Sequence, residues 1–188
     1  NGRLVEEVYR AAAGGLYAEY LQKANGYLEK ARAYADPEQA KVIDNLMRFY
    51  RTGEYTDWIR FDIDWVKNNE PVDFINGFIE TYRDARSAKG TAQSFVSITD
   101  RKLSQAMERI AANAQYFEDR APWDARYKKQ APKPPVAKAV ETIVETGDCH
   151  VTTVGDNLSN ENEIREKDGT KRVVFTGSMR AINEAFGF

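Results

Sequence analysis

The chain has 188 residues, with 27 Lys and Arg against 29 Asp and Glu, so that its formal net charge is −2 at pH 7. Its 42% hydrophobic and 30% charged residues are typical of a globular domain, and the near-neutral balance argues against a nucleic acid or an anionic membrane as partner. One Cys excludes an internal disulfide, one His excludes a zinc site built from several histidines, and no apolar run approaches the roughly 18 residues of a membrane span.

The first residue is Asn rather than Met, and no signal peptide pattern follows it. We expect the chain to be a piece of a longer protein, and we expect that protein to be cytoplasmic.

The first 70 or so residues predict helices. Apolar residues recur at three- and four-residue spacing over about 3–34, which predicts helix with a weak point at Gly14-Gly15. Asp36, with a proline directly after it, is a strong helix start, and Gly53 is a plausible stop. A third helix is expected over about 56–68. The residues that we expect on its buried face are Trp58, Ile59, Ile63 and Val66.

The pattern changes to that of a strand after Pro71. Residues 72–83 are rich in β-branched and aromatic types, and a second such run covers 93–99. Because side chains alternate along a strand, Glu80 and Tyr82 are expected on one face. A carboxylate on such an apolar strand must face water, a cation or a ligand, so Glu80 is a candidate for binding an ammonium group, with an ordinary solvent-facing glutamate as the alternative.

The remaining residues predict a mixture of helices and strands. In chain order we expect a helix over about 100–119, a proline-rich surface connection over 121–136, strand-like segments at 143–144 and 151–154, a polar loop, a short extended segment at 173–175 and a helix over about 178–186. The residues spaced for burial on the first of these helices are Leu103, Met107, Ile110, Ala114 and Phe117. The expected fold is therefore α+β, mainly helical with a small mixed β-sheet, in a single fragment 1–188 that is helical over about 1–70 and α+β over about 71–188.

Two further motifs are candidates for chemistry. Cys149 and His150 are adjacent on a strand-like segment, where neighbouring side chains point to opposite faces, so a structural role is favoured over a nucleophile–base pair. Asn157, Asn160 and Asn162 lie in the polar loop, where asparagine is common for its backbone conformation. Their amides can also donate and accept, so two of them could bracket a polar ligand head.

The string GFIETYRD, Gly77 to Asp84, resembles the GFIExYRD segment of the dipeptidyl peptidase III family of zinc metallopeptidases. The loop GDNLSNENEIR, Gly155 to Arg165, is similar to the G-x-N-x-x-N-x-x-x-x-R loop of that family, and the Pro122-Trp123 pair also matches. The resemblance covers about residues 40–182.

The resemblance implies roles for individual residues. Glu80 would bind the free amino terminus of an oligopeptide substrate with the help of Asn157 and Asn160. Tyr82 would assist the oxyanion, and Arg165 would lie toward the carboxyl-terminal side of the substrate. The segment that would pair with the peptide backbone comprises Val151, Thr152, Thr153, Val154 and Gly155.

The zinc motif of that family, HExxGH, is absent from the chain. The resemblance therefore implies the substrate-binding portion of a zinc-dependent dipeptidyl peptidase, inactive alone, with zinc held elsewhere in the parent protein and none bound to this chain. Its partners would be the oligopeptide and the remainder of the parent chain, and its sheet would belong to a larger barrel-like core. The alternatives are a non-catalytic peptide- or protein-binding module without a metal site, and a helical scaffold in which the similarities are coincidental.

Overall fold

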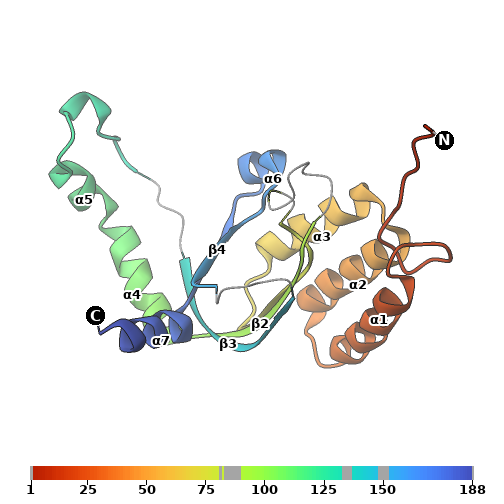
Figure 1. Ribbon diagram of the computed structural model, residues 1–188. Helices are drawn as coiled ribbons and strands as arrows, with labels where there is room; N and C mark the ends of the chain where they lie inside the picture. Colours follow the sequence, from red (N-terminus) through yellow and green to blue (C-terminus); the bar gives the residue numbers. More distant parts are fainter. Residues whose placement is uncertain (1, 81, 83–89, 133–136, 148–152, 188) are drawn as a thin grey trace. The chain divides into compact units, whose positions relative to one another are not determined.

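The structure is a computed structural model, which describes residues 2–80, 82, 90–132, 137–147 and 153–187. The chain divides into two compact units. The helical unit comprises Asn1–Glu70 and Glu161–Gly169, and the sheet unit comprises Pro71–Asn160 and Thr170–Phe188. Helices combined with one five-stranded mixed sheet confirm the expected α+β fold class (Figure 1).

The helical unit contains α1 (Ala18–Arg32), α2 (Pro37–Thr52), α3 (Tyr55–Lys67) and the short α6 (Asn162–Lys167). Helix α2 packs against both α1 and α3. It begins as predicted, because Oδ1 of Asp36 accepts a hydrogen bond from the backbone N–H of Gln39 at 2.9 Å. It ends at Gly53, whose φ of 71° lies in the left-handed region that glycine tolerates best.

The helix expected over about 3–34 is wrong in its first half, because α1 begins only at Ala18. Tyr17, directly before the helix, has a left-handed φ of 58°, and Gly14 has a φ of 77°. Instead of making helical hydrogen bonds, the backbone N–H of Ala11 donates to the carbonyl of Tyr50 near the end of α2 at 2.6 Å. The apolar spacing of this segment is that of a helix, but it has the weak Gly14-Gly15 step, and the N–H groups of Ala11 and Ala12 bond to the end of α2.

Helix α3 forms where it was predicted, but it turns a different face inward. Its buried residues are Asp57, Phe61, Asp62 and Trp65, whereas Trp58, Ile59, Ile63 and Val66 are only half-buried. The rings of Trp58 and Phe61 lie 5.3 Å apart. Periodicity alone did not find this face because two of its four members are aspartates.

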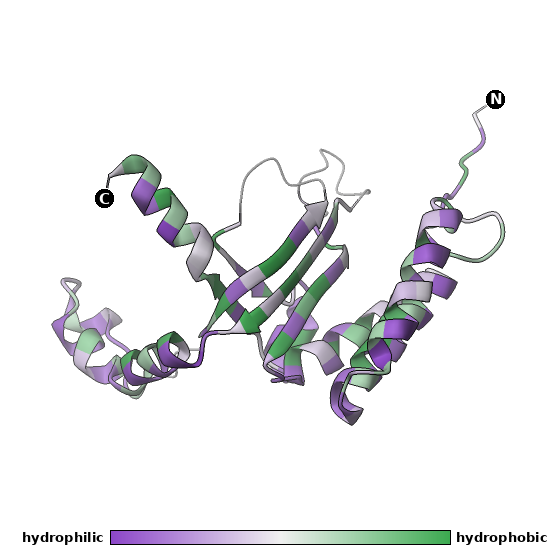
Figure 2. Cartoon of the chain, turned by 90° about the horizontal axis from the view of Figure 1, so that it is seen from below, coloured by the Kyte–Doolittle hydropathy of each residue, from purple (hydrophilic) through white to green (hydrophobic). Residues whose placement is uncertain are grey.

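The sheet unit is built on a curled sheet of β1 (Val72–Phe78), β2 (Ala92–Thr99), β3 (Ala137–Gly147), β4 (Gly155–Leu158) and β5 (Lys171–Phe175). The strand order is β1-β2-β3-β5-β4, and every neighbouring pair is antiparallel except β3 and β5. Figure 2 shows hydrophobic and hydrophilic residues alternating along these strands. Phe95 of β2 stacks on Phe175 of β5 in the core of the unit, with ring centroids 5.2 Å apart.

Strand β1 is shorter than the predicted strand over 72–83, because it ends at Phe78. The carbonyl of Thr91 still accepts a hydrogen bond from the N–H of Ile79, at 3.1 Å, so pairing continues for one residue. The strand alternation therefore does not extend to Glu80 and Tyr82. Glu80 is 4% exposed and Tyr82 is 65% exposed, so the two side chains do not share the environment that was predicted for them.

The other helices of the sheet unit are α4 (Arg101–Ala112), α5 (Ala114–Arg120), the one-turn η2 (Ala125–Tyr127) and α7 (Thr176–Phe186). Both α4 and α7 pack against β3. The helix expected over about 100–119 is interrupted at Asn113, whose φ of −100° and ψ of 19° are not helical. The apolar row on it is not buried: the one buried residue of α4 and α5 is Ser104.

No helix in the part of the chain that the structure describes is long and apolar enough to cross a membrane.

Candidate functional site

Glu80 lies two residues beyond β1 and is buried. Its backbone carbonyl accepts a hydrogen bond from Oγ1 of Thr91 at 3.4 Å, which ties the residue to the segment before β2. Its carboxylate oxygen Oε2 is buried and accepts no hydrogen bond from any residue that the structure describes. A buried carboxylate oxygen without a donor is costly, so this atom favours the arrival of a cation or a hydrogen-bond donor.

The structure brings Asn160 next to Glu80. Nδ2 of Asn160 donates to the carbonyl of Ile79, the residue before Glu80, at 3.4 Å. Asn157 lies on β4, is exposed, and accepts a hydrogen bond from Nε of Arg172 at 2.8 Å. The two asparagines that the resemblance assigns to one ligand head are thus held by different neighbours.

Tyr82 and Arg165 are both described, and they belong to different units of the chain. Tyr82 is 65% exposed. Arg165 lies on α6 in the helical unit, where it donates to Oδ1 of Asn162. Glu80, Asn157 and Asn160 belong to the sheet unit.

Val151 and Thr152, which begin the segment expected to pair with a peptide, lie outside the described residues, and so do Cys149 and His150. Within the described part, the carbonyl of Val154 accepts a hydrogen bond from Phe175 at 3.0 Å, and Gly155 begins β4. Strand β4 is the last strand of the sheet on its side, so its outer edge pairs with no other described strand. An edge strand offers backbone N–H and C=O groups to an added peptide strand.

A second acid, Asp156, lies half-buried on β4 and was not among the predicted site residues. Burial, followed by the negative charges of Glu80 and Glu145, raises the pKa of Asp156 to about 6. Oδ2 of Asp156 is buried and accepts no hydrogen bond from a described residue. Glu145 on β3 accepts at 3.4 Å from both the N–H and Oγ1 of Thr153. The negative charges of Glu80 and Glu145 thus both act on Asp156.

The available signal for Asp156 was its place in the sequence. It lies between Val154 and Leu158 at two-residue spacing, so an acid occupies the apolar face of a short strand. The stretch after Val154 was predicted to be a polar loop, in which no alternation of side chains is expected.

The residues that the structure describes contain no group of three or more His, Cys, Asp or Glu that could hold a metal ion. The one His of the chain, His150, lies outside the described residues. The donor set of this chain therefore does not fit a zinc site with histidine ligands.

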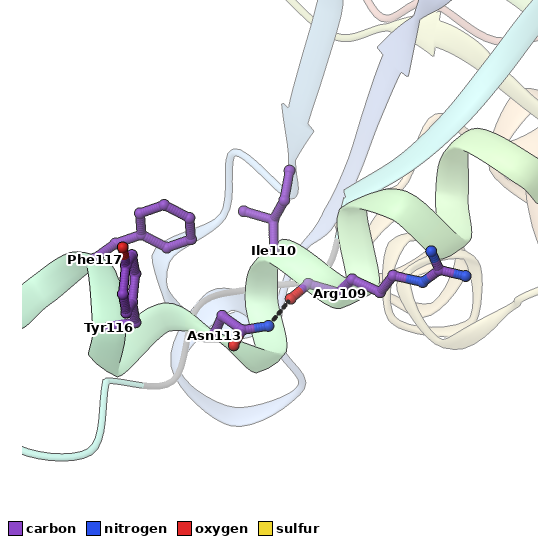
Figure 3. A pocket seen from close by; sticks show the side chains of 5 residues that line it. All are labelled: Arg109, Ile110, Asn113, Tyr116 and Phe117. Carbon is purple, nitrogen blue, oxygen red and sulfur yellow. Dashed lines mark hydrogen bonds between the residues drawn. The ribbon is translucent and has the colours of Figure 1, made fainter.

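A pocket of about 330 Å³ lies on α4 and α5 (Figure 3). Its lining consists of Arg109, Ile110, Asn113, Tyr116 and Phe117. Nδ2 of Asn113 donates to the carbonyl of Arg109 at 2.7 Å, which closes the end of α4. None of the residues predicted to bind a substrate lines this pocket.

Comparison with known proteins connects these features to one family. The sequence pattern of Peptidase family M49 matches residues 6–186. The chain is 29% identical to human dipeptidyl peptidase 3 over 170 residues, which are 89% of this chain and 23% of that protein. It is 30% identical over 176 residues to dipeptidyl peptidase 3 of Dictyostelium discoideum, covering 92% of this chain and 25% of that protein.

The fold also has a solved counterpart. The structure of DPP III from Caldithrix abyssi superposes with a TM-score of 0.75 and 25% sequence identity, covering 86% of this chain and 31% of that one. The chain therefore spans between about a quarter and a third of the length of these relatives.

Proposed function

Since the chain belongs to Peptidase family M49, we propose that it is the substrate-binding portion of a zinc-dependent dipeptidyl peptidase, which removes dipeptides from the amino terminus of oligopeptides. Relatives named dipeptidyl peptidase 3 match nearly the whole of this chain, and the chain spans only part of their length. The activity belongs, in this proposal, to a longer protein, and the chain alone is inactive.

The observation that carries the proposal is the buried Oε2 of Glu80, which accepts no hydrogen bond from the described residues. An ammonium group has three donors and a positive charge, so it would compensate both the lost hydration and the negative charge of this carboxylate. A free amino terminus is the ammonium group that every unblocked oligopeptide carries. Asn160, tied to the carbonyl of the residue before Glu80, is within reach to assist.

The edge strand β4 supports the proposal that the chain binds the backbone of the peptide. A peptide that adds to its outer edge would be held by main-chain hydrogen bonds, which do not depend on the sequence of the peptide. With the amino terminus fixed at Glu80, the distance from that anchor would define which peptide bond is cut. Tyr82 and Arg165 keep the roles that the resemblance implies, as assistance to the oxyanion and as a contact toward the carboxyl-terminal side.

Zinc would come from outside this chain. The sequence has one His and no HExxGH motif, and the described residues offer no cluster that fits a zinc ion. We therefore assign no residue of this chain to the metal and no step of hydrolysis to residues 1–188 alone. The partner of the chain in this proposal is the remainder of the parent protein, which would supply the zinc-bearing part.

The test compares Glu80→Gln with Glu141→Gln in the full-length protein. Both substitutions remove one negative charge from the sheet unit, but Glu141 on β3 contacts Thr176 and Arg180 rather than the site. We expect Glu80→Gln to lower kcat/KM for a free oligopeptide by about tenfold to a hundredfold, since it weakens one charge-assisted contact. Glu141→Gln should leave kcat/KM nearly unchanged. Equal effects of the two variants would contradict the proposal.

The inactivity of the chain alone needs its own experiment. Purified residues 1–188, freed of metal and then supplied with zinc, should release no arylamine from a dipeptidyl arylamide. Turnover by this material would show that the chain carries its own catalytic centre.

The second candidate function is a peptide-binding module without hydrolysis. It is favoured by the edge strand β4 together with the absence of a zinc-binding set among the described residues. The full-length protein would then bind an oligopeptide with a free amino terminus but release no dipeptide, which the same assay would reveal.

A further inference from the structure

Asp156 has no role in the resemblance to the peptidase family, yet it lies near enough to Glu80 and Glu145 for their negative charges to raise its pKa. We propose that Asp156 is a second substrate-binding carboxylate, and that Glu80 and Asp156 together take the amino-terminal ammonium group of the peptide between them. The inference deepens the proposed function and rests on it.

The geometry that supports this is a pair of buried, unpartnered oxygens. Oε2 of Glu80 and Oδ2 of Asp156 are both buried, and neither accepts a hydrogen bond from a described residue. Glu80 is only 4% exposed, so its carboxylate cannot replace the missing hydrogen bond by turning into bulk water. An ammonium group between the two oxygens would donate to each of them and would use two of its three N–H bonds.

The charges around Asp156 also favour binding of a cation. Burial and the charges of Glu80 and Glu145 raise the pKa of Asp156, so the three acids repel one another in the free protein. Such repulsion destabilises the empty site and is relieved when a cation enters it. The arrangement therefore favours a cationic group over a neutral one of the same shape.

The basic side chains around β4 do not supply that cation to Oδ2 of Asp156. The charged residues on strands β1, β3 and β5 are Asp73, Lys138, Glu141, Glu145, Lys171 and Arg172. Lys171 donates to Asp73 at 2.7 Å, and Arg172 donates to Asn157 at 2.8 Å. Lys138 on β3 lies in register with Val173 of β5, which in turn pairs with the aspartate of β4. None of these donors is hydrogen-bonded to that buried oxygen.

The inference predicts that substrate binding is coupled to a proton. In the free protein Asp156 takes up a proton near pH 6, and a protonated carboxyl group no longer attracts an ammonium. With the peptide bound, the neighbouring positive charge lowers the pKa of the same carboxyl group. The affinity for a free amino terminus should therefore fall as the pH is lowered through about 6.

The experiment measures KM and kcat of the full-length protein for a dialanyl arylamide between pH 5 and pH 8. The variants are Asp156→Asn, Glu80→Gln and the control Glu141→Gln. We expect Asp156→Asn to raise KM about tenfold at pH 7 with kcat changed less than about twofold, as for the loss of one charge-assisted contact. The rise of KM below pH 6 seen in the unaltered protein should be absent from this variant.

The outcomes separate this inference from the function on which it rests. If Glu80→Gln raises KM and Asp156→Asn does not, the proposed function stands and the role of Asp156 is wrong. If the unaltered protein does not cleave the arylamide, both fail. If Asp156→Asn does not fold, the pH dependence of KM in the unaltered protein still tests the inference. A KM that is constant from pH 7 to pH 5 overturns it.

Discussion

Nζ of Lys171 lies 2.7 Å from Oδ2 of Asp73, and both side chains are only 6% exposed. The two residues are 98 positions apart in the sequence and come from β5 and β1, which are not neighbours in the sheet. The ion pair therefore spans the curled sheet across its buried face. Because two buried charges compensate each other, removing only one of them leaves the other without a partner.

Because of this ion pair, we expect the two single variants to lose much more unfolding free energy than the double variant does. Asp73→Asn and Lys171→Met should each lower the free energy of unfolding by about 3 kcal/mol, while the double variant should recover most of that loss. Urea unfolding followed by circular dichroism measures all three. As a control, Lys167→Met breaks the exposed pair with Glu163 and should leave the free energy of unfolding nearly unchanged. Additive losses in the double variant would contradict this view of the pair.

The second prediction concerns the contact between α4 and β3. The backbone N–H of Ala139 donates to Oγ of Ser104 at 3.1 Å, and Oγ donates back to the carbonyl of Ala139 at 3.3 Å. Ser104→Ala leaves both backbone groups with one partner fewer in a buried place, so we expect a loss of about 2 kcal/mol in unfolding free energy. Gln105→Ala, at an exposed position of the same helix, is the control and should have little effect. Hydrogen exchange of the Ala139 amide should accelerate in the first variant alone.

The sequence was sufficient to predict the ends of a helix where capping residues define them. Helix α2 begins after Asp36 and ends before Gly53, as the sequence predicts. Both signals act within a few residues, because one is a side-chain acceptor and the other a left-handed glycine. The segment before Ala18 has helical periodicity but no such cap, and its hydrogen bonds go to the end of α2 instead. Sequence spacing cannot reveal a partner that lies some forty residues away.

The site was predictable only in part, for a related reason. Glu80 was found because a carboxylate in an apolar strand is conspicuous, and the structure gives it a buried, unpartnered oxygen. Asp156 was missed because its burial depends on the pairing of β4 with β5, which the sequence of a polar loop does not show. The alternation argument for Tyr82 failed because β1 ends at Phe78, four residues before Tyr82.

A third prediction follows from the buried Asp57 of α3. Burial raises the pKa of this carboxyl group, but the hydrogen bond from Thr52 and the contacts with Arg48 and Arg60 lower it more, so that the pKa lies below its ordinary value. A lowered pKa means that Asp57 stabilises the fold above the pKa of about 4 that it has in the unfolded chain. That contribution is lost as the pH falls through the lower pKa of the folded state.

Asp57→Asn should therefore lower the free energy of unfolding by about 1 kcal/mol at pH 7, through weaker contacts with its charged partners. The difference between the variant and the unaltered protein should shrink as the pH falls below about 4, where the aspartate is losing its charge. Urea unfolding monitored by the fluorescence of Trp58 and Trp65, which lie on the same helix, measures this difference. A gap that is constant down to pH 2 would show that shape rather than charge explains the effect.

Asp156 predicts the opposite pH dependence. Its folded-state pKa of about 6 lies above the value of about 4 expected in the unfolded chain, so its negative charge destabilises the fold at neutral pH. Asp156→Asn removes that charge and should raise the free energy of unfolding by about 2 kcal/mol at pH 8. Between pH 6 and pH 4 the aspartate takes up its proton in the folded state first, so the advantage of the variant should fall steadily and vanish below pH 4. Urea unfolding at pH 8, 6 and 4 measures this, with Glu141→Gln as the control for loss of one charge. A variant that is less stable than the unaltered protein at pH 8 would show that Asp156 has a stabilising partner. A gain in stability is instead expected, because an acid that serves a preformed cation site is unfavourable for stability while the site is empty.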